Sequence, residues 1–215
     1  MVLNLRDCVL RHGAFGSVHV AKYCGVDVAV KTVLHPVEEE ATLLASMRHR
    51  HIVRLIGACI APPYCLVTEY APHGSLFDHI RRAPAYGAPA IIDWALQIAR
   101  GVEYLHTGLS HIILHRDLKA ANVLVFDDDS AATRRRFSQR DPAASGATGG
   151  SERLPPLLLK LCDFGSSRSF TRDTIMTFAG TIPWLAPEAL RCERVSEKCD
   201  VYRCVSESVS ERDGE

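Results

Sequence analysis

The chain has 215 residues, equal numbers of acidic and basic side chains, and 47% hydrophobic residues. A balanced charge argues against a general nucleic-acid-binding protein, and no apolar run approaches the roughly 18 residues that a membrane-spanning helix needs. The composition therefore predicts one soluble globular unit, or two small lobes that share a cleft.

Cysteine usage indicates the compartment. There is no CxxC pair, and most cysteines lie in apolar, strand-like segments, which favours reduced, buried thiols of a cytoplasmic protein. Zinc coordination or a disulfide framework is the less favoured alternative. The N-terminal residues lack the basic and apolar regions of a secretory signal. The eight cysteines are Cys8, Cys24, Cys59, Cys65, Cys162, Cys192, Cys199 and Cys204.

Residues 5–33 predict three strands, at 5–10, about 17–23 and 26–33, with a turn at residues 24–25. In the third strand Ala29 and Lys31 alternate with valines, so they share one face. Gly13 and Gly16 precede the second strand and allow the backbone to approach phosphate groups closely. An ordinary hairpin turn is the alternative explanation of this glycine pair.

A helix is predicted over residues 36–48, because Pro36 suits the first turn and three glutamates complement its positive end. Glu40, Leu44 and Met47 are spaced to share one face of it. Only eight residues separate Lys31 from Glu40, so the helix must start late. Two further strands are predicted at 52–57 and 64–70, followed by a short helix at about 75–82.

A longer amphipathic helix is predicted from about residue 90 to 107. Its expected buried face consists of apolar residues at four-three-four-three spacing. Gly101 costs roughly 1 kcal/mol in such a helix, which burial of that face can offset, and Trp94 is interpreted as a core residue. The face comprises Ile91, Ala95, Ile98, Val102 and Leu105.

After a strand at 123–126 the composition changes. Residues 127–156 contain acidic and arginine runs and a small-residue stretch, so they bury too little apolar surface to order themselves. We predict a disordered insertion here, with a strand resuming at 157–161. The motif Arg135-Arg136-Phe137-Ser138 is compatible with phosphorylation by a basophilic kinase, but a solvated tether is the favoured interpretation.

The segment His115–Asn122 supplies the clearest chemistry. Asp117, Lys119 and Asn122 place a carboxylate, an ammonium and an amide within six residues, and Asp163 adds a second carboxylate about forty residues later. Phosphoryl transfer from a nucleotide needs such a set. Loop acids without function are the alternative. The patterns H-R-D-L-x-x-x-N and D-F-G are the protein-kinase signature, and the chain resembles that family from about residue 5 to 202.

The resemblance implies an α+β, bilobal kinase fold. A small antiparallel β-sheet would form the N-terminal lobe (1–69), a hinge would follow (69–72), and a mostly helical C-terminal lobe would span 73–202 around the insertion. That lobe is expected to be incomplete after the start of the family's helix F. Glu207 and Glu211 stand where the family has core leucines, and buried unpaired carboxylates are costly. Residues 203–215 are therefore interpreted as an atypical, solvated tail.

The resemblance also implies roles for individual residues. Asp117 would orient the substrate hydroxyl and accept its proton, and Lys119 would stabilise the moving phosphoryl group. Asn122 and Asp163 would hold Mg²⁺. Lys31, paired with Glu40, would hold the α- and β-phosphates of ATP. The other nucleotide contacts would come from Gly13, Gly16, Val18, Ala29, Thr68 behind the adenine, the backbone of Glu69 and Ala71 at its edge, and Leu124.

Two further features follow from the resemblance. An internal stack of Leu44, Leu55, His115 and Phe164 is expected to lead to Asp200, which would anchor the catalytic loop. Arg11 stands where the family has the first glycine of its phosphate loop, so it would either impair loop closure or contact a phosphate.

The subfamily is indicated by mixed signals. Lys119 and Thr181 favour serine/threonine transfer, whereas the hinge at 67–70 is tyrosine-kinase-like, and this mixture resembles the tyrosine-kinase-like group. Within it, residues 99–106, 113–119 and 179–184 are most similar to mixed-lineage kinases. We therefore expect a cytoplasmic serine/threonine kinase with a protein substrate and MAP-kinase-kinase-kinase-like signalling. The alternatives are a nucleotide-binding pseudokinase or scaffold, and an inactive fragment.

An activation loop is expected between residues 163 and 188. Added phosphates there could pair with Arg116 and order the loop. Of its threonines Thr171, Thr174 and Thr177, the last two are the candidate phosphorylation sites.

Overall fold

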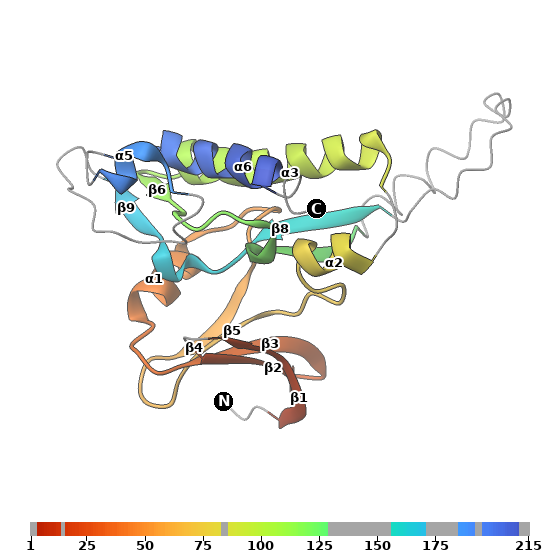
Figure 1. Cartoon of the computed structure of the whole chain (residues 1–215). Helices are drawn as coiled ribbons and strands as arrows, with labels where there is room; N and C mark the ends of the chain where they lie inside the picture. The colour runs from red at the N-terminus through yellow and green to blue at the C-terminus, as the bar shows by residue number, and fades with distance from the viewer. Residues whose placement is uncertain are drawn as a thin grey trace, which may run out of the picture.

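The computed structural model describes residues 4–13, 16–82, 86–128, 156–170, 185–191 and 195–210, and side chains within 16–82, 86–128, 156–168, 185–191 and 195–204. A five-stranded antiparallel sheet occupies the N-terminal part, and helices with two two-stranded sheets form the rest (Figure 1). This confirms the predicted α+β arrangement. The sheet has the order β1-β2-β3-β5-β4, with β1 (Asn4–Gly13), β2 (Gly16–Tyr23), β3 (Val26–Val33), β4 (Leu55–Cys59) and β5 (Tyr64–Glu69).

Side-chain alternation along β3 gives the sheet two different faces. Val28 and Val30 are buried against Val67 on the outer face. The inner face carries Lys31 opposite Leu66, and Leu66 belongs to the main core. The predicted bounds of β3 are confirmed, because a β-branched, alternating run between turn residues specifies a strand locally.

The flanking strands differ from the prediction. β1 continues to Gly13 instead of ending at residue 10. Its register with β2 shifts at two places, and the pairing continues beyond both shifts. The strand predicted from residue 52 begins only at Leu55. Ile52 and Val53 are buried in the preceding loop, where the Val53 N–H donates to the Leu161 carbonyl at 2.9 Å. The prediction was wrong here because these two apolar residues are buried without being part of the strand.

Helix α1 (Glu38–Ser46) packs on the inner side of the sheet and is shorter than the predicted helix. It ends because Met47 adopts an extended backbone conformation. Its first turn is acidic, as expected from the helix dipole, and it buries Glu40, Ala41 and Leu44. The eight residues after Lys31 are therefore enough for a helix that begins late.

Helix α2 (Leu76–Arg82) begins with a side-chain cap, in which the Asp78 N–H donates to Ser75 Oγ at 3.2 Å. The longer helix α3 (Ala88–Thr107) agrees closely with the predicted span. Its predicted buried face is confirmed at Val102 and Leu105 but is wrong at Ile91, which is 54% exposed, and at Ala95, which is exposed. The helix buries Trp94, Gln97, Gly101, Val102 and Leu105.

Gln97 explains this rotation of the buried face. Its amide Nε2 donates to the Leu157 carbonyl at 3.0 Å, and its Oε1 accepts the Leu159 N–H at 2.9 Å. Both partners lie on β8 (Leu157–Leu161), which pairs with β7 (Val123–Asp127). A polar side chain thus docks α3 onto the hairpin with its hydrogen bonds satisfied.

The remaining elements complete the helical part. β6 (Ile112–Leu114) pairs with β9 (Arg168–Phe170), and α5 (Pro187–Leu190) and α6 (Lys198–Ser210) follow. Figure 1 shows α6 running beside α3, and the His106–Asp200 hydrogen bond joins the two helices. The backbone is helical to Ser210, and Arg203 is only 2% exposed. The expectation of a solvated tail that begins at residue 203 is therefore wrong at its first residue.

Other expectations concern the described residues only in part. The insertion closes at its base, where the Asp128 N–H donates to the Pro156 carbonyl at 2.9 Å, while residues 129–155 lie outside the described ranges. Among the described cysteines, six are free thiols, with Cys65 and Cys199 buried and Cys24 exposed. Across the described residues, no helix is both long enough and apolar enough to cross a bilayer.

Candidate active site

The β7–β8 hairpin brings two distant polar segments together. Asn122 ends the 3-10 turn η1 (Ala120–Asn122) just before β7, and Asp163 follows β8 by two residues. The Cys162 N–H donates to the Asn122 carbonyl at 2.9 Å. Strand pairing of Val123 with Leu161 therefore fixes both predicted metal-binding residues at one end of the hairpin.

Asn122 and Asp117 form a buried hydrogen-bonded unit. Asn122 Nδ2 donates to the Asp117 carbonyl at 2.8 Å and to Asp117 Oδ2 at 2.9 Å. These bonds use the amide nitrogen and leave Asn122 Oδ1 as its acceptor atom. Lys119 Nζ lies 2.7 Å from Asp117 Oδ2, so a cation and a carboxylate stand side by side in the catalytic loop.

Lys31 joins the sheet to the helical part through two carboxylates. Its Nζ lies 3.1 Å from Glu40 Oε1 and 2.8 Å from Asp163 Oδ1. Burial opposes the charge of Lys31, but the carboxylates of Asp163 and Glu40 outweigh it and raise its pKa. The predicted Lys31–Glu40 contact is thus present, although few residues separate the strand from the helix.

The two carboxylates respond differently to the same cation. Burial raises the pKa of Glu40, and the charge of Lys31 offsets this only in part. For Asp163 the burial effect is overcome by the charge and hydrogen bond of Lys31, so its pKa is lowered. The Asp163 side chain is also 45% exposed. Asp163 is therefore an ionised carboxylate with access to solvent, as a metal-binding oxygen donor requires.

The backbone conformation around Asp163 sets the direction of its side chain and of the turn that follows. Asp163 has a φ of 63°, in the left-handed region, where Asp is tolerated better than most residues. The chain then makes the 3-10 turn η2 (Phe164–Ser166). A Cβ on Gly165 would meet Glu40 Oε2 at 3.3 Å, so glycine allows η2 to lie close against α1.

His115 links this segment to α6. Its Nδ1 accepts the Asp117 N–H at 3.3 Å, so the Nε2 atom, 3.0 Å from the Cys162 carbonyl, is the donor. The ring is then neutral, in agreement with a pKa lowered mainly by burial. Its centroid lies 4.9 Å from that of Phe164. The side chains of Leu44 and Phe164 lie in the same core, with Leu55 packed against it, as the implied stack requires.

Asp200 accepts hydrogen bonds from three groups. Its Oδ2 accepts the His115 N–H at 2.9 Å and its Oδ1 accepts the Arg116 N–H at 2.8 Å. His106 Nε2 lies 2.9 Å from Oδ2. Burial opposes ionisation of this fully buried carboxylate, but these hydrogen bonds and the neighbouring His115 lower its pKa. The expected anchor of the catalytic loop is present.

The inner face of the sheet forms one wall of the candidate active site. Val18 pairs with Lys31, and Ala29 pairs with Thr68, so all four side chains lie on one face. All four are partly exposed. On the opposite side, Leu124 of β7 is partly exposed and forms a β-bridge with Ser75, and the buried Ala71 lies between the sheet and this turn.

Gly16 connects β1 to the sheet. Its φ is +144°, and a Cβ there would overlap the Thr32 carbonyl oxygen. Glycine is therefore required by β3, whatever the loop binds. Gly13 pairs with Gly16 across the strands. The intervening residues, and the side chain of Arg11, lie outside the description, so neither interpretation of Arg11 is tested.

Two functional contacts were missed by the sequence analysis. Lys160 Nζ binds the Glu69 carboxylate at 2.7 and 2.8 Å, so the Glu69 side chain is tied to β8. In addition, the Glu69 N–H donates to the Arg54 carbonyl at 3.1 Å, which engages part of the backbone predicted to contact adenine. The second missed residue is Arg203, which donates to the Arg116 carbonyl and lies 3.6 Å from Asp117 Oδ1.

The metal-binding expectation fits the donors present. Mg²⁺ takes oxygen ligands and usually keeps water and phosphate oxygens in its coordination shell. Asn122 Oδ1 and the Asp163 carboxylate are suitable donors at one end of the hairpin. In the part of the chain that the structure describes, no group of three or more His, Cys, Asp or Glu side chains forms a metal site. Thr171, Thr174, Thr177 and Thr181 lie outside that part.

Comparison with known proteins places this geometry in a wider context. The protein kinase domain family matches residues 9–206. The chain is 36% identical over 195 residues to mitogen-activated protein kinase kinase kinase 13-A of Xenopus laevis, covering 90% of this chain and 17% of that protein. It is 35% identical over 204 residues to mitogen-activated protein kinase kinase kinase 10 of Mus musculus, covering 88% and 19%. The chain thus spans less than a fifth of these relatives, and the resemblance to mixed-lineage kinases is confirmed.

Proposed function

Because the chain belongs to the protein kinase domain family, we propose that it transfers the γ-phosphate of ATP to serine or threonine hydroxyl groups of a protein. The observation that carries this proposal is the double contact of Lys31 Nζ with Glu40 and Asp163. It joins the sheet, α1 and the segment after β8 around one cation, and kinase catalysis requires this lysine and these two acids to be in place together.

Asp117 is the residue that we assign to the attacking hydroxyl. Its carboxylate is held by Asn122 and Lys119, so it has a fixed orientation. A hydroxyl in contact with this carboxylate is aligned for attack and loses its proton to it as the new bond to phosphorus forms. Lys119 then neutralises charge on the transferring phosphoryl group.

Lys31, Asn122 and Asp163 are assigned to the nucleotide. Lys31 binds α- and β-phosphate oxygens, and Asn122 Oδ1 and Asp163 supply oxygen ligands to Mg²⁺. A Mg²⁺ ion held by these two residues would supply positive charge to offset the charge that develops on the phosphate oxygens. Val18, Ala29, Thr68 and Leu124 enclose the adenine, because their partly exposed side chains line the sheet and hairpin on either side.

A phosphoryl-transfer assay with radiolabelled ATP and a generic protein substrate tests this function. We expect Mg²⁺-dependent transfer to serine or threonine that falls by at least a hundredfold in Asp117→Asn, the scale of losing a positioned base. The control is Asp127→Asn, which changes the same functional group at a side chain that is 58% exposed. Absence of transfer by the unaltered chain would contradict the proposal.

A second candidate is a nucleotide-binding scaffold without turnover. It is favoured by Arg203, whose buried guanidinium lies 3.6 Å from Asp117 Oδ1, on the carboxylate that must receive the substrate proton. Thermal stabilisation by Mg·ATP without phosphoryl transfer would identify this case. A broad, non-cooperative melting transition without stabilisation would indicate an inactive fragment.

The relatives are named mitogen-activated protein kinase kinase kinases. We propose the same tier of signalling for this chain, with a cytoplasmic location and a protein substrate. Phosphorylation of Thr174 or Thr177 is proposed to order the segment that follows Asp163, through a new ion pair with Arg116. Mass spectrometry of the expressed protein after incubation with Mg·ATP tests which threonine carries phosphate.

A further inference from the structure

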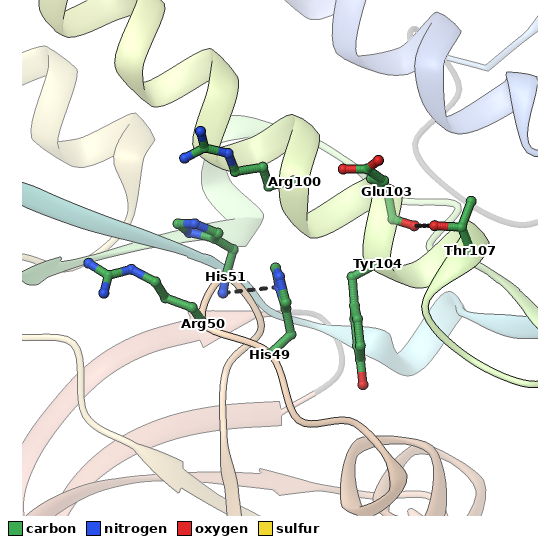
Figure 2. A pocket seen from close by; sticks show the side chains of 7 residues that line it. All are labelled: His49, Arg50, His51, Arg100, Glu103, Tyr104 and Thr107. Carbon is green, nitrogen blue, oxygen red and sulfur yellow. Dashed lines mark hydrogen bonds between the residues drawn. The ribbon is translucent and has the colours of Figure 1, made fainter.

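A pocket lies on the surface between the loop at residues 49–51 and one side of α3. Its volume is about 430 Å³, and it is separate from the Lys31–Asp163 cluster. Arg50 and His51 line it from the loop, and Arg100 and Tyr104 line it from the helix (Figure 2). Two arginines and an imidazole therefore converge from two different elements.

The floor and wall of the pocket are held in place by the fold. His51 is 4% exposed, and its Nδ1 is 2.9 Å from the Leu159 carbonyl. His49 stacks on Tyr104, with ring centroids 4.6 Å apart and planes inclined by 8°. The Arg48 N–H donates to the Tyr104 hydroxyl at 2.9 Å. One wall is thus aromatic, and Figure 2 shows the His51 ring between the two arginine side chains.

The basic side chains of this pocket are in different electrostatic states. Burial lowers the pKa of His51, and the charges of Arg50 and Arg100 lower it further, with Asp93 acting in the opposite direction. Arg50 Nη2 donates to Asp128 Oδ1 at 2.5 Å. Arg100 makes no hydrogen bond or ion pair within the described ranges, although Glu103 also lines the pocket. The pocket thus offers the exposed side chain of Arg100 beside Arg50, which is paired with a carboxylate.

We propose that this pocket binds a phosphate group between Arg50 and Arg100. The planar guanidinium matches phosphate oxygens with paired N–H donors, and charge-assisted bonds of this kind are about twice as strong as neutral ones. The His49–Tyr104 wall provides an apolar surface beside the anion for the group that carries it. The site is independent of the proposed catalytic function, because it shares no residue with the catalytic cluster.

Nuclear magnetic resonance of the histidine imidazoles tests the site directly. Inorganic phosphate is titrated into the nucleotide-free protein at constant pH and ionic strength. We expect saturable shifts of the His49 and His51 resonances, with about tenfold weaker binding in Arg100→Ala, the effect of losing one charge-assisted hydrogen bond. Arg100→Lys, which keeps the charge but loses the paired donors, is expected to fall between the two.

Arg54→Ala is the matched control, because it removes the same exposed charge from the same loop outside the pocket. Binding unchanged in Arg54→Ala supports the site. Shifts that do not saturate, or equal weakening in both alanine variants, overturn it. A phosphoserine peptide and its unphosphorylated form distinguish the source: tighter binding of the phosphopeptide than of inorganic phosphate indicates a protein ligand, and equal binding indicates the ion itself.

Discussion

Single side chains at the catalytic cluster are positioned by charge as much as by packing. Lys31 keeps its ammonium charged in a mostly enclosed place because two carboxylates contact it. Glu40 is the more deeply buried partner, and burial raises its pKa. Its contribution is therefore expected to lie in the orientation of Lys31 rather than in stability, because a buried ion pair gains little net free energy.

The variant Glu40→Gln tests whether Glu40 orients Lys31 without stabilising the fold. The free energy of unfolding is expected to change by less than about 1 kcal/mol, because Lys31 keeps Asp163 as an ionic partner. Phosphoryl transfer is expected to fall at least tenfold, because Lys31 loses the contact that directs it. Urea unfolding and initial-rate measurements check the two effects, and a large loss of stability would contradict the interpretation.

His51 predicts a pH dependence of stability. Its pKa is lowered in the folded protein, first by burial, so the folded state favours the neutral ring. The stabilisation is present above the unfolded pKa of about 6.5 and is lost as the pH falls through the folded value. The melting temperature should therefore drop below about pH 6.5, and the drop should be smaller in His51→Gln. If the melting temperature fell equally in both proteins, the other buried histidines would be the cause of the pH dependence.

Individual elements show what sequence patterns specify. The alternation that places Ala29 and Lys31 on one face of β3 was predictable, because strand periodicity is local. The first half of the buried face of α3 was not, because Gln97 is counted as polar although β8 satisfies both ends of its amide. The catalytic loop could be located from its motif. The contact of Arg203 with Arg116 depends on tertiary packing and has no local signal.

Gly101 illustrates the same limit within α3. Alanine normally stabilises a helix interior by about 1 kcal/mol relative to glycine. Here an added Cβ would meet Leu161 Cδ1 at 3.0 Å and the His51 carbonyl oxygen at 3.1 Å. Gly101→Ala is therefore expected to destabilise the protein by about 1–3 kcal/mol, the usual cost of overpacking. Equilibrium urea unfolding checks the sign, and stabilisation would show that β8 can shift to make room.

Gly16 and Gly25 form a matched pair at the two ends of β2. Both have positive φ, but a Cβ on Gly25 would meet nothing within 4 Å. Gly25→Ala should cost only backbone strain, on the order of 1 kcal/mol. Gly16→Ala adds overlap with the Thr32 carbonyl and should cost clearly more. Comparison of their thermal midpoints tests the difference, and equal midpoints would show that β2 and β3 can separate at this end at little cost.

At the level of the whole molecule, α6 is fastened to the catalytic loop by one buried acid. Asp200 receives bonds from His106 on α3 and from the His115 and Arg116 amides. Asp200 itself lies more than 80 residues further along the chain than any of these three groups. The position of the catalytic loop therefore depends on the presence of α6.

Asp200→Asn is expected to destabilise the protein by about 3–5 kcal/mol, because an amide nitrogen replaces one acceptor and leaves buried donors unpaired. Hydrogen exchange should show faster exchange at the His115 and Arg116 amides than in the unaltered protein. The surface variant Asp127→Asn serves as the comparison. Retained protection at both amides would mean that other contacts hold the loop.

The Glu69 carboxylate has a mechanical consequence. It is bonded to Lys160 on β8 and to the Arg54 N–H before β4, so the sheet is tethered to the β7–β8 hairpin directly beside the segment that connects them. Tilting of one half against the other would stretch these bonds least if it pivoted about this point. The connecting segment would then act as a hinge that these hydrogen bonds restrain. The largest displacements would fall at the edge of the sheet that is farthest from it.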